Sequence, residues 1–576
     1  MGKILIIGLD GATFDLIRPW AQQGKLPHLA RLMEKGVQGE LKSTYPPMSP
    51  PAWTSFMTGK NPGKHGIFDF AARKPCSYEI EFINARHRKA TTIWKLMSDA
   101  GKRVCVLSLP ITYPPEKING IMISGLDAPG VGGLADPSAI YPPDLHQELL
   151  DKLGGYQISP NLEQFSTGQC DEMVEAALRT VQSKLENALY LYQKEAWDCF
   201  MITIGETDGV AHRLWKYHDP HSPLSPNRGT ESDGADPILR IYAKVDHYMG
   251  RLCALAPEDT TIIVISDHGH GGVGNKAVYL NSWLEQKHFL KFKADTSGSP
   301  FSALFQRVAA RGVLGAGRFG LKVLPAGFKK RVFRRTYLAN RVASWLRFSV
   351  IDWKHTQAYS EETPYYPTVW INVQGREPAG TVKPGAEYED LRDRIIRELY
   401  HLVDPETKQP VVKTVRRREE IYSGPYVEKF PDLIIEWGLD NGYSYRFKSS
   451  QGGRAGRAPI AYVDNKEQEE SKSGDHRDFG IFIALGRELK ASLQLTEVDI
   501  LDIAPTVLYL LDLPLPADMD GKVLTQMLRE EYLSSHPLCY ASETGSGENI
   551  SNQGPGYSPE DEKAIKARLQ GLGYIE

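Results

Sequence analysis

Three short apolar segments of the chain each lead to an aspartate. The pairs of segment and aspartate are Ile4–Gly8 with Asp10, Phe200–Gly205 with Asp208, and Thr261–Ser266 with Asp267. Because ligands of open α/β sheets bind beyond the carboxyl ends of the strands, we expect these carboxylates to meet in one crevice. Three unpaired carboxylates there would repel one another and would be costly to remove from water. Divalent cations remove that conflict, so the pattern predicts a metal site.

Three histidines extend this set of ligands. His212 follows Asp208 by four residues, about one helical turn, so both side chains can face the same ion. His268 adjoins Asp267, and His476 precedes another apolar segment. Aspartate and histidine without cysteine suit Zn²⁺ or Mn²⁺ better than Ca²⁺ or Mg²⁺. Each of these features alone is more often a helix cap or a turn, and it is their joint occurrence that predicts chemistry.

A serine followed by proline begins a predicted helix that stops at Gly59. Ser49 is expected to be the N-cap and Pro50 the first helical residue. The simplest interpretation is a well-capped helix. The functional interpretation is that the backbone N–H groups and the dipole at this helix end favour a phosphate. A metal bound to the Ser49 oxygen would then lower its pKa and make it a nucleophile.

The elements that must position these residues are short strands alternating with helices. Apolar, β-branched segments without period-2 alternation suit strands that are buried on both faces, as in a mostly parallel sheet. Helical stretches such as Met173–Gln193 and Pro237–Ala256 lie between them, which predicts an α/β sandwich. The five clearest strand segments are Ile4–Ile7, Val104–Leu109, Phe200–Ile204, Thr261–Ile265 and Phe479–Ala484.

The 576-residue chain exceeds what one simple core holds, so we expect a catalytic core with a large insertion. Residues 1–290 are assigned to the first part of the core and residues 461–535 to its closing part. Residues 291–460 are assigned to a cap. A polar linker and a C-terminal helix starting at Pro559 occupy residues 541–576.

The predicted cap contains a strongly basic segment, residues 301–348. This segment has eleven lysines and arginines and no acidic residue. Apolar residues such as Phe305 and Trp345 are interleaved, as in amphipathic helices. One interpretation is a surface that attracts anionic substrates or makes peripheral contact with acidic lipid. The other is a solvated helical insertion whose charges only keep it soluble.

Composition and charge exclude several classes of function. The hydrophobic content of 41% and the charged content of 24% are ordinary for a globular protein, and the net charge of -3 argues against binding of a nucleic acid polymer. The six scattered cysteines include no CxxC pair, which argues against a disulfide framework or a cysteine zinc site. A signal-peptide core and a stretch of about 18 apolar residues that could span a bilayer are both missing, so we expect a cytoplasmic location.

Taken together, these motifs resemble the alkaline phosphatase superfamily, and within it the type I phosphodiesterase/nucleotide pyrophosphatase family. The resemblance spans roughly residues 3–275 and 470–525. The matching stretches are Gly8–Gly11, Ser49–Pro51, Met57–Gly59, Pro62–Ile67, Thr207–His212, Ser266–Gly269, His476–Ile483, Asp502–Leu508 and Met519–Lys522. The fold implied by this resemblance is a three-layer α/β sandwich of the alkaline phosphatase type, with a mostly parallel central sheet and an inserted helical cap.

The resemblance also implies two divalent metal ions, zinc with manganese as the alternative. The ligand sets that it implies are Asp208, His212 and His476 for one ion, and Asp10, Asp267, His268 and the Ser49 oxygen for the other. By this resemblance, Ser49 attacks phosphorus in line to give a covalent phosphoserine, which a metal-bound hydroxide then hydrolyses. The implied activity is that of a phosphodiesterase or nucleotide pyrophosphatase acting on an anionic phosphoester.

Two positions depart from the family pattern. Ser49 stands where threonine is typical, and Phe70 stands where the family has an asparagine that helps to bind the phosphoryl oxygen. Stabilisation of that oxygen is therefore expected from backbone N–H groups near Pro51–Trp53, or from another side chain.

Other functions stay open at this point. A phosphomonoesterase or a phosphoglycerate-mutase-like phosphotransferase of the same superfamily would use similar ligands, and an inactive relative would bind an anion or lipid. A sulfatase is disfavoured because Trp53 stands where an arginine is required. The glycines of Gly269–Gly274 match a dinucleotide-binding motif, but metal ligands claim the same turn. His65, His218 and His270 lie near the motifs without an assigned role.

Overall fold

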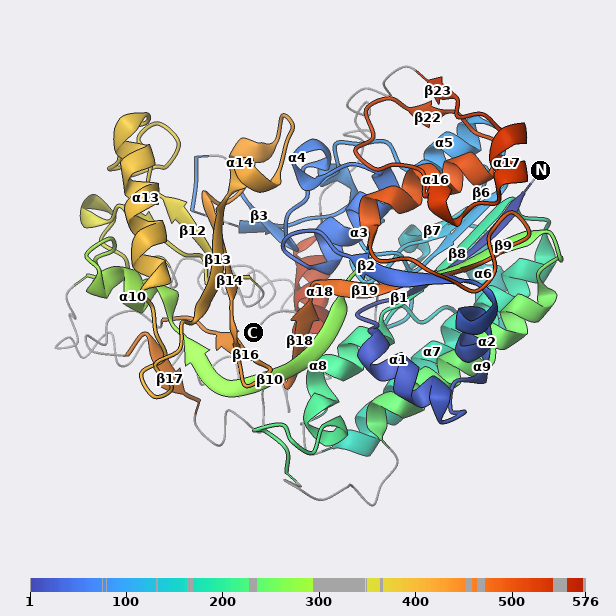
Figure 1. The fold of residues 1–576 in the computed structure, drawn as a ribbon, viewed down its shortest axis with the longest axis horizontal. Coiled ribbons are helices and arrows are strands. Elements are labelled where there is room, and N and C mark those ends of the chain that lie inside the picture. The colour runs from blue at the N-terminus through green and yellow to red at the C-terminus, as the bar shows by residue number, and fades with distance from the viewer. Residues whose placement is uncertain are drawn as a thin grey trace, which may run out of the picture.

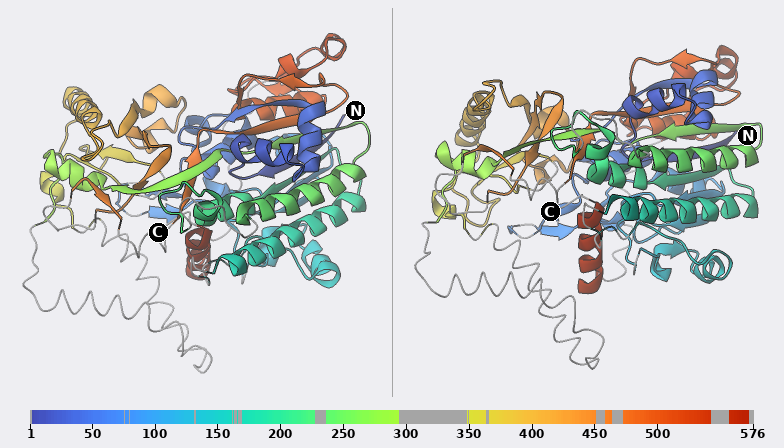
Figure 2. Two further views of the ribbon diagram at one scale, coloured as in Figure 1. Left: turned by 60° about the horizontal axis from the view of Figure 1, so that its bottom comes forward. Right: turned by 90° about the horizontal axis from the view of Figure 1, so that it is seen from below.

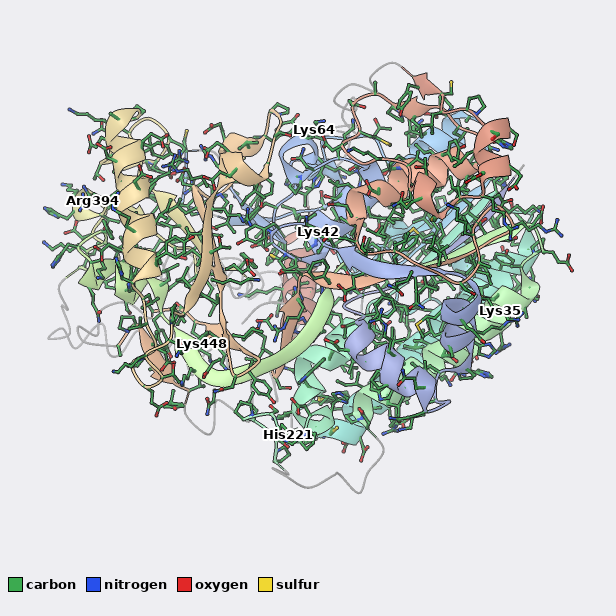
Figure 3. All side chains as sticks on the ribbon, in the orientation of Figure 1. Lys35, Lys42, Lys64, His221, Arg394 and Lys448 are labelled. Atoms are coloured by element: carbon green, nitrogen blue, oxygen red, sulfur yellow. The ribbon has the colours of Figure 1, made fainter. Side chains whose placement is uncertain are left out.

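The protein is described here by a computed structural model. It describes residues 2–293, 348–541 and 557–572, apart from positions 75, 79, 131–132, 161, 163–164, 166–168, 227–235, 349, 363–365, 451–457 and 464–471. The basic segment 301–348 therefore lies, except for Phe348, outside the described residues, and its lipid contact stays a prediction. The described residues form a core lobe and a cap lobe along the long axis of the molecule (Figure 1). Lys35 in the core lobe and Arg394 in the cap lobe mark opposite sides in Figure 3.

The core lobe is built on a ten-stranded sheet. Its strands are β1 (Lys3–Leu9), β2 (Val37–Lys42), β5 (Val104–Leu107), β6 (Gly120–Ile123), β7 (Ile140–Tyr141), β8 (Cys199–Ile204), β9 (Thr260–Ile265), β19 (Phe479–Leu485), β20 (Leu493–Gln494) and β21 (Val498–Asp499). They are ordered β20–β2–β19–β9–β1–β8–β5–β6–β7, with β21 also beside β2. The run β9–β1–β8–β5–β6 is parallel throughout, whereas β19 is antiparallel to both of its neighbours. The sheet is therefore mostly parallel, as the sequence predicts.

Helices cover both faces of this sheet. The helices of one face are α1 (Phe14–Gln22), α2 (Pro27–Lys35), α6 (Leu145–Leu153), α7 (Cys170–Lys194), α8 (Glu206–His218) and α9 (Pro237–Leu255), and those of the other are α3 (Ser49–Thr58), α5 (Ile93–Asp99) and α16 (Ile503–Leu510). Leu5 and Ile7 of β1 pack with the first group, whereas Ile4 and Ile6 pack with the second. This alternation makes the core lobe a three-layer α/β sandwich, and Figure 2 shows α7 and α9 side by side on one face.

The cap lobe contains two sheets together with helices. Its strands are β11 (Ala358–Tyr359), β12 (Thr368–Ile371), β13 (Val412–Arg417), β14 (Leu433–Trp437), β15 (Leu439–Asp440), β16 (Tyr443–Phe447) and β17 (Ile460–Tyr462). They form the sheet β11–β12–β14–β13, and the sheet β15–β16–β10–β17 with β10 (Gly269–Val278). Helices α10 (Leu280–Gln286) and α13 (Ala386–Tyr400) pack with these strands in the hydrophobic cluster of the cap lobe, whose buried members lie between Val278 and Ile460 in the sequence. The limits 291 and 460 of the cap stay a prediction.

The long strand β10 connects the two lobes. Its first residues pair with β18 (Gly474–Arg477) next to the core sheet, and its last residues pair with β16 and β17 of the cap. Figure 1 shows this strand crossing from one lobe to the other. Because β10 follows Asp267 and His268 directly, the cap is joined to the predicted metal site by continuous backbone.

The C-terminal helix α18 (Pro559–Leu572) packs on the core lobe. It begins at Pro559, as the sequence predicts, and Ile565, Leu569 and Leu572 are buried in the same cluster as α8. Among the described helices, none combines the length and the hydropathy needed to cross a membrane.

Gly8 of β1 has no side chain, and the indole of Trp53 from α3 packs directly against its backbone. A Cβ at Gly8 would lie 2.7 Å from Trp53 Cη2 and 3.0 Å from Thr203 Oγ1. We expect Gly8→Ala to lower the free energy of unfolding by about 1–3 kcal/mol, because the added methyl group overpacks a buried indole. Urea denaturation measures this change. Gly438→Ala, whose Cβ would make only contacts of 3.5 Å, is the control. Equal losses in the two variants would contradict the expectation.

Candidate active site

Asp10 lies just beyond the carboxyl end of the central strand β1 and is fully buried. Its Oδ2 accepts a hydrogen bond from Trp53 Nε1 (3.1 Å), and its backbone carbonyl accepts one from Thr207 Oγ1 (2.6 Å). The next residue, Gly11, has a φ of 65°, and a Cβ there would lie 2.6 Å from Asp208 Oδ1. Glycine tolerates this positive φ and has no Cβ to clash with the carboxylate, so the end of β1 can approach the start of α8, which carries Asp208.

Ser49 is the first residue of α3 and is buried beside Asp10. Its Oγ lies 3.4 Å from Asp10 Oδ1 and 3.3 Å from His268 Nε2. The N-cap of the helix is Met48, so the prediction that Ser49 caps the helix is wrong by one residue. The Ser49 hydroxyl faces Asp10 and His268 instead of the backbone N–H groups of its own helix. The helix ends at Gly59 in a left-handed conformation, as predicted.

Asp208 and His212 lie one turn apart on α8, and both are fully buried. His212 Nε2 is 3.3 Å from Asp208 Oδ2. From β18, His476 brings its Nε2 to 2.9 Å from His212 Nε2 and to 3.7 Å from Asp208 Oδ1. Ligand atoms of these three residues all lie within 4.8 Å of one another, so they can hold one metal ion.

Three histidines of the site direct the same nitrogen towards its centre. In each ring Nδ1 faces a backbone carbonyl, namely Gly474 O for His212 (2.9 Å), Gly269 O for His268 (2.9 Å) and Pro47 O for His476 (2.8 Å). An Nδ1–H that donates to a carbonyl leaves a lone pair on Nε2. The Nε2 atoms of His212 and His476, 2.9 Å apart, are then both acceptors. A cation bound to both nitrogens would stabilise this arrangement.

The three aspartates are buried together, and each perturbs the others. Burial, followed by the charges of Asp267 and Asp208, raises the pKa of Asp10. Burial and then the charge of Asp208 raise the pKa of Asp267 to about 7. Burial also acts to raise the pKa of Asp208, but the facing His212 holds that pKa well below its ordinary value.

Several carboxylate oxygens at this site fit a bound cation. Both oxygens of Asp208 and Oδ2 of Asp267 are buried and accept no aligned hydrogen bond from any residue that the structure describes. Buried anionic oxygens without donors are costly unless a cation neutralises them. Asp10, Asp208 and His268 form a second group whose ligand atoms lie within 4.8 Å of one another. Asp267 lies beside this group, with Oδ2 3.3 Å from His268 Nε2.

The structure thus brings all seven predicted site residues to one edge of the central sheet. A sequence model of the type I phosphodiesterase/nucleotide pyrophosphatase family matches residues 4–476, a span that includes all of them. The chain belongs to the type I phosphodiesterase/nucleotide pyrophosphatase family. The chain is therefore a phosphoester hydrolase of the phosphodiesterase/pyrophosphatase type, and its Asp and His groups are suited to hold metal ions.

Comparison with curated proteins gave no match. Among solved structures, human ectonucleotide pyrophosphatase/phosphodiesterase 5 is similar at 13% identity and a TM-score of 0.45, over 92% of this chain and 100% of that one. Phosphonoacetate hydrolase from Sinorhizobium meliloti 1021, in complex with phosphonoformate, is similar at 13% identity and a TM-score of 0.48, over 88% of this chain and 95% of that one.

At Phe70, which departs from the family pattern, and at the start of α3, few groups can bind the phosphoryl oxygen. Phe70 is buried in the hydrophobic cluster of the core lobe, so its position offers no polar group. Pro51 has no N–H, and the N–H of Ala52 donates to the carbonyl of Met48 at 3.0 Å. Residues 51 and 52 therefore offer no free N–H group to a phosphoryl oxygen, and other groups are needed to stabilise the negative charge of that oxygen.

Sequence reasoning missed or left unassigned several residues that shape the site. Trp53 and Thr207, which bond Asp10, carry no spacing signal because their partner is distant in the chain. His270 was noted only by its position, and its Nδ1 lies 3.1 Å from Asp208 Oδ1. Burial, followed by the charge of His212, lowers the pKa of His270 to about 4.

His218 and the glycine motif Gly269–Gly274, both noted in the sequence, have structural roles. His218 Nδ1 lies 2.6 Å from Asp236 Oδ2 in an ion-pair contact that joins the end of α8 to the start of α9. The glycine motif Gly269–Gly274 lies in the extended strand β10 rather than in a loop that begins a helix, so a dinucleotide-binding interpretation is wrong.

A cleft adjoins the site on the side of His476. Its walls come from both lobes. They include Pro47 and Arg477 of the core lobe and the aromatic side chains Tyr366, Trp437, Tyr445 and Phe447 of the cap lobe. The indole Nε1 of Trp437 is buried and has no hydrogen-bond partner among the described residues.

His65 is buried against Ser55, with 3.0 Å between its Nε2 and the serine Oγ. Burial, followed by the charge of Arg88, lowers the pKa of His65 to about 3. Because histidine in an unfolded chain has a pKa of about 6.5, the unfolded state binds a proton below that pH that the folded state does not. Stability from this group is therefore lost as the pH falls from about 6.5 towards 3.

As the pH falls below about 6.5, His65 should lower the free energy of unfolding by up to about 1.4 kcal/mol per pH unit. We expect His65→Asn to remove this part of the pH dependence. Urea denaturation of both proteins between about pH 5 and pH 7 measures the slope. The same pH dependence in wild type and variant would show that His65 does not resist protonation.

Proposed function

We propose that the chain hydrolyses a phosphodiester or a pyrophosphate with Ser49 as the nucleophile and two divalent metal ions, zinc or manganese, in the site. The observation that carries this proposal is the position of Ser49 Oγ. It is buried, 3.4 Å from Asp10 Oδ1 and 3.3 Å from His268 Nε2, and both partners belong to one group suited to a metal. A hydroxyl so placed is suited to lose its proton and attack phosphorus.

The residues that would hold the ions follow from the two groups. Asp208, His212 and His476 would hold one ion, and Asp10 and His268, with Asp267 beside them, would hold the other. When bound, such ions lower the pKa of a coordinated nucleophile and stabilise charge on the attacking and leaving oxygens.

The protein's own groups orient the nucleophile. Asp10 Oδ1 accepts a hydrogen bond from the Ser49 hydroxyl, while Trp53 Nε1 holds the other oxygen of the same carboxylate. The reacting atom lies at the N-terminus of α3, where the helix dipole favours negative charge although Pro50, Pro51 and Ala52 offer no free N–H group. In the reaction, the Ser49 Oγ–P bond forms as the P–O bond to the leaving group breaks, and the hydroxyl proton passes by way of Asp10 Oδ1 to the departing oxygen. A water oxygen then bonds to phosphorus as the Oγ–P bond breaks, and one proton of that water returns to Ser49 Oγ.

The cleft beside His476 supports a substrate with an organic group on phosphorus. Its cap wall offers the flat apolar surfaces of Tyr366, Trp437 and Phe447, together with the buried N–H of Trp437. We expect an organic group on the phosphorus to lie in this space, whose lining includes His476. The proposal therefore places substrate choice in the cap.

Replacing Ser49 tests the proposal. We expect Ser49→Ala to lower kcat for bis(para-nitrophenyl) phosphate by at least about 10³-fold, because the attacking oxygen is lost. Ser49→Thr keeps a hydroxyl and is expected to retain turnover within about tenfold. Ser55→Ala, on the same helix but facing His65, is the control for the helix itself. Full turnover by Ser49→Ala would exclude Ser49 as the nucleophile.

A further inference from the structure

We propose that the C-terminal segment, residues 557–572, is a strap whose docking on the core lobe is coupled to metal binding, so that each strengthens the other. This inference rests on the metal site proposed above. It goes beyond that site because it assigns a role to a segment that contributes no residue to either metal-binding group of the described residues. Figure 2 shows helix α18 of this C-terminal strap, in dark red, beside the core lobe.

Hydrogen bonds fix the strap to the loop that follows β6. Three successive backbone carbonyls of this loop accept hydrogen bonds from two side chains of the strap. Arg568 Nη1 donates to Leu126 O (2.8 Å) and to Ala128 O (2.6 Å). Tyr557 donates its hydroxyl proton to Asp127 O (2.8 Å). Arg568 is 5% exposed, and a charge that is buried to this extent needs such acceptors, so these bonds hold the strap in one position.

The loop held by the strap supports a second loop, which follows β5. The carboxylate of Asp127 accepts hydrogen bonds from the backbone N–H groups of residues 111–113, over distances of 2.9–3.4 Å. The ring of Tyr113 stacks on that of Tyr557, with 5.6 Å between centroids and 9° between the planes. The strap therefore supports the loops at the carboxyl ends of two neighbouring strands of the core sheet.

The strap also contacts α8 beside the metal ligands. Leu572 packs on Gly209, where a Cβ would lie 2.9 Å from Leu572 Cδ2. Gly209 directly follows Asp208, the residue common to the two groups that can hold a metal. Leu572 also lines a pocket together with Asp10 and Pro110, so it forms part of a wall that borders a second candidate ligand.

Metal binding and strap docking therefore act on the same turn of α8, residues 206–209. Without cations, the buried charges of Asp10, Asp208 and Asp267 repel one another and favour separation of the strand ends from this turn. Movement of the turn would change the surface on which Leu572 packs. A bound cation would remove the repulsion and hold the turn where the strap contacts it. Two binding events that favour one conformation strengthen each other by the same factor, typically about 5–150-fold.

Hydrogen exchange of the full-length protein with and without saturating Zn²⁺, followed by mass spectrometry, tests this coupling. We expect Zn²⁺ to slow amide exchange in residues 565–569 of α18 by about fivefold or more, because the bound ion stabilises the docked strap. Helix α13, which packs in the cap lobe, is the control, and its exchange is expected to change by less than about twofold.

Substitutions in the strap test the reverse effect. Arg568→Met removes the bonds to the loop, and Leu572→Ala removes the contact with α8. We expect each variant to bind Zn²⁺ about fivefold more weakly than the wild type in competition with a chromophoric chelator. Lys563→Met, at an exposed position of the same helix, is the control and is expected to stay within about twofold. Urea denaturation of each metal-free variant checks that the core is folded.

Each contrary result overturns a distinct part of the account. Equal exchange in α18 with and without Zn²⁺, or equal slowing in α13 and α18, would overturn the coupling without any substitution. Wild-type zinc affinity in both folded strap variants would overturn it as well. A wild-type chain that binds no Zn²⁺ would overturn the proposed metal site itself, and this outcome appears before exchange is measured.

Discussion

The structure depends on the confinement of three carboxylates at one edge of a buried sheet. Asp10, Asp208 and Asp267 are all fully buried, and the burial and mutual repulsion that raise the pKa of Asp10 and Asp267 oppose folding of a site left without cations. The surrounding histidines are set to favour cations, since their Nδ1 atoms face carbonyls and their Nε2 atoms converge. The negative charge that makes the site costly to bury is what would let it hold cations, and bound cations would in turn attract a phosphate.

The rest of the core can be understood from that requirement. Placing β1 between β8 and β9 brings the three aspartates to adjacent strand ends. Small residues then allow close approach: Gly8 admits the indole of Trp53, and Gly11 admits the carboxylate of Asp208. The strand β10 leads from this edge into the cap, where it pairs with β16, whose Ser444, Tyr445 and Phe447 line the cleft proposed to receive the substrate.

The sequence was sufficient for the parts of this arrangement that are local. Strand-end aspartates, the i,i+4 pair on α8 and the alternation of apolar segments predict the sheet and Asp10, Asp208, His212 and Asp267. His268, His476 and Ser49 were predicted from the motifs around them and from the family resemblance. The sequence was insufficient where partners are distant in the chain, as for Trp53 with Asp10 or His270 with Asp208, because those contacts depend on sheet order and on how α3 and β10 pack at the strand ends. The N-cap assignment of Ser49 failed because a tertiary contact of the hydroxyl outweighed local capping.

The most direct test of the central claim is the metal content of the purified protein, measured together with hydrolysis of bis(para-nitrophenyl) phosphate before and after chelation and readdition of Zn²⁺ or Mn²⁺. The account predicts about two ions per chain and a rate of diester cleavage that falls and recovers with them. Undiminished cleavage by a metal-free chain, or a metal-free chain that neither ion can activate, would contradict it.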